Sequence, residues 1–97
     1  MFDDPTSVVA DSSGNLFVLD RDNEVIRKVL PDGTVTIFAG GGQATLPGYG
    51  TDVFLGFMQF MIIDHADTLW IASSYSSSLL RIGADGLVWP ITVPGNL

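Results

Sequence analysis

Four acidic side chains near the start of the chain have the chemistry of a calcium site. They are Asp11, Asp20, Asp22 and Glu24. Residues 20–24 begin like the loop of an EF-hand, but that loop requires glycine at its sixth position and glutamate at its twelfth, where this chain has Val25 and Pro31. Short acidic side chains beside turns commonly accept hydrogen bonds from their own backbone. We therefore expect these carboxylates to cap turns, and we expect no metal site.

Acid–base and nucleophilic chemistry have little support in the sequence. His65 is the only histidine, and a zinc or iron site needs several nitrogen or carboxylate ligands. A lone general base is the one catalytic role open to it, and we expect a solvated turn residue instead. The chain has no cysteine, and the serines of residues 73–78 lack both a partner base and the glycine-flanked motif of a nucleophilic serine. These serines are expected to form a polar loop.

Charge and glycine content argue against two kinds of anionic ligand. The chain has 11 acidic and 4 basic residues, a net charge of −7, so it offers no basic face for the phosphates of a nucleic acid. The glycine-rich stretch of residues 40–56 contains no lysine, and no strand-to-helix transition follows it. A plain connection is therefore favoured over a phosphate-binding loop.

Six further side chains are candidates for contacts with a partner. The basic ones are Arg27, Lys28 and Arg81, and the aromatic ones are Tyr49, Tyr75 and Trp89. Each basic residue is expected to reach from a strand to a carboxylate on a neighbouring sheet, with recognition of an acidic partner as the alternative. The aromatic residues lie in or near loops, where they either anchor a partner or pack between sheets.

The elements that must position these groups are short strands, because turn-forming residues recur too often to leave room for a helix. We expect strands at residues 7–10, 16–19, 25–30, 35–39, 57–63, 69–72, 79–82 and 87–90. The continuous apolar run at residues 16–19 is typical of a strand covered on both faces in the middle of a sheet. Val35, Ile37 and Ala39 are expected to share one face. Pro90 has no N–H to donate, which predicts that the last strand lies at a sheet edge.

The strand pattern occurs twice. Shifting the chain by 53 residues aligns residues 11–35 with residues 64–88 without a gap. The identical pairs are Asp11 with Asp64, Leu16 with Leu69, Asp32 with Asp85, Gly33 with Gly86 and Val35 with Val88. At many positions where the residues differ, both repeats still have an apolar residue. A four-stranded unit that recurs at this spacing is the signature of a β-propeller blade.

The first repeat resembles the NHL repeat. The matching segments are residues 5–11 (PTSVVAD), 14–20 (GNLFVLD), 23–28 (NEVIRK) and 31–33 (PDG). The second repeat is similar but departs at three family positions, where it has Met58, the pair Asp67 and Thr68, and Ser73. Glycines from Gly48 onward resemble an insertion that separates repeats in one subset of the family. In that family the carboxylate at the position of Asp20 usually fixes a loop through backbone hydrogen bonds.

The resemblance implies an all-β fold: two consecutive four-stranded antiparallel blades of an NHL-type β-propeller, with the ring incomplete. Blade 1 is expected at about residues 5–40, a glycine-rich connection at 41–56 and blade 2 at about 57–97. It also implies a non-catalytic scaffold that binds proteins, with no catalytic, cofactor or metal residues. The alternative is a fragment of an NHL-like propeller lyase or lactonase whose metal and catalytic residues lie in other blades. The expected partners are a protein, further blades, or other copies that close a ring.

Overall fold

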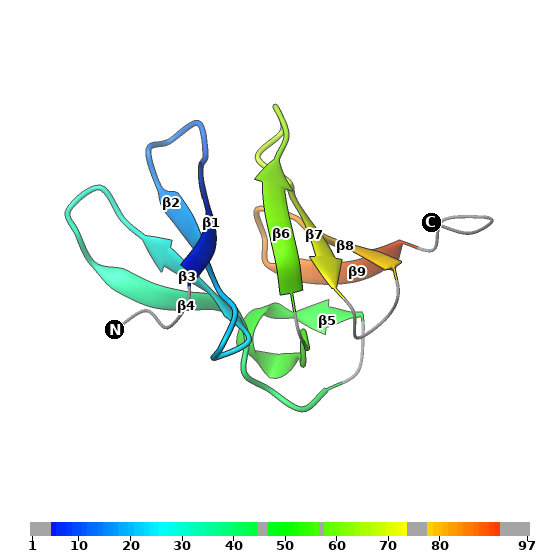
Figure 1. Cartoon of the computed structure of the whole chain (residues 1–97). Coiled ribbons are helices and arrows are strands. Elements are labelled where there is room, and N and C mark those ends of the chain that lie inside the picture. The colour runs from blue at the N-terminus through cyan, green and yellow to red at the C-terminus, as the bar shows by residue number, and fades with distance from the viewer. Residues whose placement is uncertain (1–4, 45–46, 57, 74–77, 92–97) are drawn as a thin grey trace.

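The protein, described by a computed structural model at residues 5–44, 47–56, 58–73 and 78–91, is built from two antiparallel sheets that lie side by side (Figure 1). Sheet 1 contains β1 (Pro5–Ala10), β2 (Leu16–Asp20), β3 (Val25–Val29) and β4 (Val35–Gly40). Its strands pair in chain order, β1-β2-β3-β4. The predicted meander is therefore confirmed, and β2 lies in the middle of the sheet as its apolar composition indicated.

Sheet 2 has five strands in the order β5-β9-β8-β7-β6. They are β5 (Gly48–Tyr49), β6 (Met58–Ile63), β7 (Leu69–Ser73), β8 (Ser78–Ile82) and β9 (Leu87–Ile91). In the described residues the only helical element is a 3-10 turn, η1 (Gly50–Asp52), and none of those residues forms a helix with the length and hydropathy to cross a membrane. The predicted all-β fold is confirmed.

The 53-residue repeat is visible in the hydrogen bonds of the turns. The Asp11 N–H donates to the Asn15 carbonyl at 3.0 Å, and the Asp64 N–H donates to the Thr68 carbonyl at 3.1 Å. The later turns repeat the same way, because the Leu30 N–H donates to Thr34 as the Gly83 N–H donates to Leu87. The two sheets therefore share one backbone plan even where their residues differ.

The core lies between the sheets, and each sheet buries only one of its faces in it. Sheet 1 contributes Phe17, Leu19, Ile26 and Ala39, and sheet 2 contributes Met58, Met61, Leu69, Ile71, Leu80, Ile82 and Val88. Val53 and Leu55, from the connection, complete the cluster and are fully buried. Burying such a side chain is worth about 1.5–3 kcal/mol, so this shared cluster holds the two sheets together.

A β-bulge in sheet 1 overturns one sequence prediction. Ile26 pairs with Ala39, but the next residue, Arg27, pairs with Ile37, so the register shifts by one residue at this point. Because of the bulge, side chains of β4 that are two residues apart on either side of it lie on opposite faces of the sheet. Ala39 is fully buried in the core, whereas Ile37 is 46% exposed on the opposite face. The prediction that Ile37 and Ala39 share a face was wrong.

The edge of sheet 2 also differs from the sequence prediction. β9 lies between β8 and β5, so the strand that contains Pro90 is not the edge strand. β5 pairs with β9 only at Leu87 and Val88, and Pro90 lies beyond that pairing, where its missing N–H costs no bond to β5. The glycine-rich stretch is thus more than a connection, because it supplies an edge strand to the sheet.

Candidate functional site

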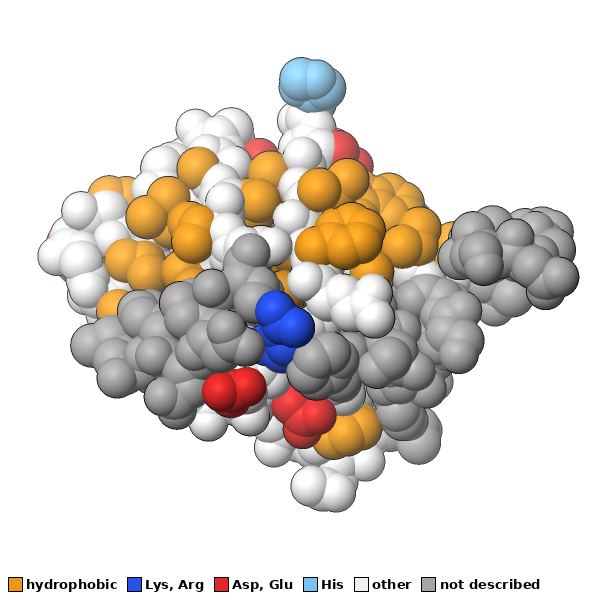
Figure 2. Space-filling model, in the orientation of Figure 1, with side chains coloured by type: hydrophobic (Ala, Val, Ile, Leu, Met, Phe, Trp, Pro, Cys, Tyr) orange, Lys and Arg blue, Asp and Glu red, His pale blue; other side chains and the backbone are white. Residues whose placement is uncertain are grey.

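Two hairpin turns, one from each sheet, frame a hollow at one end of the molecule. The turns join β1 to β2 and β6 to β7, and they lie side by side at the upper end in Figure 1. The hollow between them has a volume of about 330 Å3 and is lined by Ala10, Asp11, Ser12, Ile63, Asp64, His65 and Asp67. We call it the inter-turn hollow. The histidine side chain projects from the same end, drawn in pale blue in Figure 2.

Asp11 holds the first of these turns. Its Oδ1 accepts the N–H groups of Ser13 and Asn15, both at 2.9 Å, and its Oδ2 accepts from Asn15 Nδ2 at 2.9 Å. The hydrogen bond from the Asn15 side chain lowers the pKa of Asp11, and the two backbone N–H groups act in the same direction, against the opposing effect of burial. The carboxylate is therefore an ionised turn cap.

Asp64 caps the second turn in the same way as Asp11 caps the first, but with a different side-chain donor. Its Oδ1 accepts the N–H groups of Ala66 at 2.9 Å and Thr68 at 3.0 Å, and its Oδ2 accepts from Trp70 Nε1 at 2.9 Å. The indole hydrogen bond is the largest cause of a lowered pKa for Asp64. The tryptophan on β7 thus takes the part that Asn15 has in sheet 1.

Asp67 joins the two turns. It occupies the repeat position of Gly14, and both residues have positive φ, 62° for Asp67 and 88° for Gly14. Its carboxylate accepts the Ser12 N–H at 2.9 Å and the Ser12 hydroxyl at 2.5 Å. We call this pair the Ser12–Asp67 clasp. Sequence reasoning missed the clasp, although an aspartate in place of a turn glycine was the signal that could have suggested it.

The other three acidic candidates from the sequence, Asp20, Asp22 and Glu24, do not lie near Asp11. Asp20 follows at the opposite end of β2, where it is fully buried, forms an ion pair with Arg27 Nε at 2.9 Å and accepts from Asn23 Nδ2 at 3.0 Å. The resemblance implied backbone partners for Asp20, whereas these two partners are side chains. Asp22 and Glu24 lie in the turn after β2, with Glu24 at a positive φ of 59°. Within the described residues no three His, Cys, Asp or Glu side chains are grouped so that they could hold a metal ion.

The basic side chains have three different environments. Arg27 was expected to form an ion pair with a carboxylate on another sheet; among the described residues its Nε pairs with Asp20 of its own sheet, two positions away across the β2–β3 pair on the same face. Lys28 Nζ lies 5.7 Å from the ring centroids of both Phe17 and Phe38. Arg81 is exposed on β8 opposite Trp89, and no ion pair with another described residue involves it.

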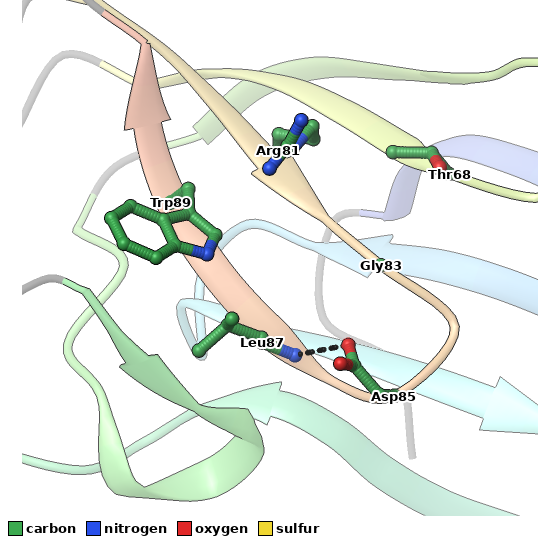
Figure 3. A pocket seen from close by; sticks show the side chains of 6 residues that line it. All are labelled: Thr68, Arg81, Gly83, Asp85, Leu87 and Trp89. Atoms are coloured by element: carbon green, nitrogen blue, oxygen red, sulfur yellow. Dashed lines mark hydrogen bonds between the residues drawn. The ribbon is translucent and has the colours of Figure 1, made fainter.

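A second hollow, of about 190 Å3, lies on the face of sheet 2 that is turned away from sheet 1 (Figure 3). It is lined by Thr68, Arg81, Gly83, Asp85, Leu87 and Trp89. The Asp85 carboxylate accepts the Leu87 N–H at 3.0 Å, so it is used within its own turn. Tyr49 is exposed opposite Leu87. Tyr75 lies outside the described residues, as do residues 74–77 of the serine-rich segment.

Comparisons with known proteins bear on the fold. No family model matches the chain, and no curated protein sequence matches it. Solved structures do match: virginiamycin B lyase from Staphylococcus aureus, with a TM-score of 0.66 over 94% of this chain, and a streptogramin B lyase, with a TM-score of 0.69 over 95%. Each is 18% identical to this chain, and the match covers 27% of the solved chain. The chain therefore has the fold of part of a β-propeller and spans about a quarter of the length of these propellers.

Proposed function

We propose that this chain is a two-blade segment of an NHL-type β-propeller that serves as a binding scaffold without catalytic chemistry of its own. In this proposal blade 1 spans about residues 5–40, the connection residues 41–56 and blade 2 about residues 57–97. The propeller fold supports the architecture, and the motif resemblance of the first repeat supports the NHL assignment.

The observation that carries the binding role is the inter-turn hollow. Three carboxylates line it, those of Asp11, Asp64 and Asp67. Hydrogen bonds fix each of them, and those that lower the pKa of Asp11 and of Asp64 stabilise the ionised form of these two carboxylates. A fixed anionic hollow at the end of a propeller suits a cationic side chain, because charge complementarity sets the specificity of an interface. We propose a lysine- or arginine-containing segment of a protein partner as the ligand.

The experiment titrates the isotopically labelled chain with a lysine-rich peptide and, in parallel, with a glutamate-rich peptide of equal length, and follows amide shifts by NMR. We expect the lysine-rich peptide alone to bind, with the largest shifts at Ser12, His65 and Asp67. Ala66→Lys adds a cation at an exposed position of the second turn and should weaken binding about tenfold or more. Gln43→Lys adds the same charge at an exposed position of the connection and serves as the matched control.

Two outcomes contradict the binding proposal. One is equal binding of both peptides. The other is an equal loss of affinity in Ala66→Lys and Gln43→Lys, because that would place the attraction in the net charge of −7 rather than in the hollow.

A second candidate function is favoured by one observation, that the solved structures reported above are both lyases. Under this alternative the chain is part of a propeller enzyme whose metal and catalytic residues lie in other blades, and His65 at the inter-turn hollow is the one histidine that this chain could add, as a general base. Incubation with a streptogramin B antibiotic, followed by liquid chromatography and mass spectrometry, tests it. The scaffold proposal expects no loss of the antibiotic above a buffer blank; turnover that His65→Ala abolishes would support the enzyme.

A further inference from the structure

The large apolar side chains that remain exposed are confined to two faces of the molecule. In the described part of the chain they are Val8, Leu16 and Ile37 in sheet 1 and Tyr49, Phe60, Ile62 and Trp89 in sheet 2. Strand pairing places all three residues of sheet 1 on the face away from the shared core, and all four of sheet 2 likewise. We call these the outer faces.

The outer faces are the repeat counterparts of the faces that pack together inside the chain. The 53-residue shift places Val8 at the position of Met61 and Leu16 at the position of Leu69, and both counterparts are buried in the core. It also places Ile62 at the position of Val9, which packs against that core. The chain therefore already contains one example of the junction that its two outer faces can form with each other.

We propose that the outer face of sheet 2 packs on the outer face of sheet 1 of a second copy of this chain. Within one chain β1 and β6 are neighbours, and Val9 and Met61 belong to the same apolar cluster. Between copies the equivalent pair is Ile62 of one chain and Val8 of the next. Val8 is 58% exposed and Ile62 55% exposed, so burying them against each other removes apolar surface that water now contacts.

The charged groups on these faces are compatible with burial. Arg81, on the outer face of sheet 2, occupies the repeat position of Lys28, which lies over two phenylalanine rings on the inner face of sheet 1. Arg81 has aromatic neighbours too, since it pairs with Trp70 on one side and Trp89 on the other, and a guanidinium stacks well on an indole. On the partner face, Arg27 is already paired with Asp20.

The junction between copies differs from the internal one in one respect. The repeat counterparts of Ser12 and Asp67 are His65 and Gly14, so no carboxylate is present to form a second clasp. We infer that the junction between copies is weaker than the internal junction and that association depends on protein concentration. Added salt strengthens it, because each copy carries a net charge of −7.

Contacts between unlike faces propagate, and they close into a ring when the rotation allows. The chain matches 27% of each solved propeller chain, so a ring of about three or four copies has a comparable length, within the usual range of about 4–8 blades. A closed ring covers both outer faces of every copy.

The experiment measures mass by size exclusion with light scattering, and affinity by sedimentation, at several protein and salt concentrations. Ile62→Lys disables one face and Val8→Asp the other, and Gln43→Lys is the matched control. We expect wild type and Gln43→Lys to associate, and Ile62→Lys to raise the dissociation constant about 100-fold, as the loss of a central interface residue does. Ile62→Lys also reduces the net negative charge, so general repulsion does not explain a loss of association.

Mixing the two variants identifies the faces. Each variant alone should be monomeric, whereas the mixture retains one intact face on each chain and should form a dimer that grows no further. If like faces packed on each other instead, one of the two variants would still form a dimer by itself. Mixing the variants would then produce no new species. That result, or a wild-type chain that stays monomeric at tens of micromolar in high salt, would overturn the proposal.

Discussion

The two hairpin turns that frame the inter-turn hollow share one backbone and differ in one decisive side chain. In the first turn Gly14 takes a positive φ, and in the second Asp67 takes the same conformation. Aspartate tolerates this region better than most residues but at some cost. That cost is offset because the carboxylate bonds to Ser12 of the other sheet. Asp67, which replaces the glycine of the first repeat, is thus the residue through which the second turn contacts the first.

A second difference separates the two sheets. Asp20 and Arg27 form a buried ion pair on the outer face of sheet 1, and their repeat counterparts are Ser73 and Leu80. Leu80 is fully buried in the core between the sheets. In sheet 1 these two repeat positions hold an ion pair on a face that no described sheet covers. In sheet 2 one of the same positions holds Leu80, which packs against the other sheet.

The largest expected effect compares the two faces of sheet 2. Ile71→Ala removes a fully buried side chain from the shared core and should lower the free energy of unfolding by about 2–5 kcal/mol. Ile62→Ala removes the same atoms from the exposed face and should change the stability of the monomer by less than about 0.5 kcal/mol. Urea denaturation at low protein concentration measures both. Equal losses would mean that the two faces are not distinct.

The next effect concerns the ion pair of sheet 1. Asp20→Ser leaves the Arg27 guanidinium, 19% exposed, without its 2.9 Å partner, and should cost about 2–4 kcal/mol. Adding Arg27→Leu introduces the residue of the second repeat and should recover at least half of that loss, because both charges of the pair are then removed together. If the double variant is as unstable as Asp20→Ser alone, the ion pair is not what the carboxylate provides.

The clasp is expected to contribute less. A double-mutant cycle of Ser12→Ala and Asp67→Gly should give a coupling of about 1 kcal/mol, the typical value for a hydrogen bond with an exposed charged partner. Asp67→Gly alone should be nearly neutral, because glycine relieves the positive φ while the bonds are lost. Additive effects of the two substitutions would show that the clasp does not couple the sheets.

The smallest effect is a difference between the two capping carboxylates with pH. Both Asp11 and Asp64 have a pKa lowered from 3.8, so their contribution to stability is present above the unfolded pKa and is lost as pH falls through the lower folded value. Trp70→Phe removes the largest cause of the shift at Asp64. Carboxyl NMR titration should then show the pKa of Asp64 returning toward 3.8 while that of Asp11 stays low. An unchanged Asp64 would contradict the indole hydrogen bond.

Much of the fold follows from local chemistry that a sequence displays. Turn residues such as Asp11 and Gly33 specify where strands stop, and the 53-residue shift predicted equivalent turns that the hydrogen bonds then matched. The bulge beside Ile37 and the added strand β5 were not predictable in this way. A bulge depends on pairing with a distant strand, and a two-residue strand with glycine in it carries no periodic signal.

The candidate site was predictable only in its parts. The sequence indicated that Asp11 caps a turn and that His65 lies in one, and the structure agrees on both. It gave no indication that these turns meet across two sheets, because such proximity arises from the packing of faces rather than from neighbouring residues. Ser12 and Asp67 are 55 residues apart in the chain, so their hydrogen bonds form only once the core has brought the two turns together.

The most direct test of the account is a disulfide trap between copies, which the absence of cysteine makes possible. Val8→Cys and Ile62→Cys chains are mixed under mild oxidation and separated on non-reducing gels, with Val9→Cys, one residue along β1 on the inner face, as the control partner. The unlike-face junction predicts a rapid Val8→Cys with Ile62→Cys heterodimer and little product with Val9→Cys, since a bridge needs Cα atoms within about 7 Å. Preferential Ile62→Cys homodimers, or equal trapping by Val9→Cys, would contradict it.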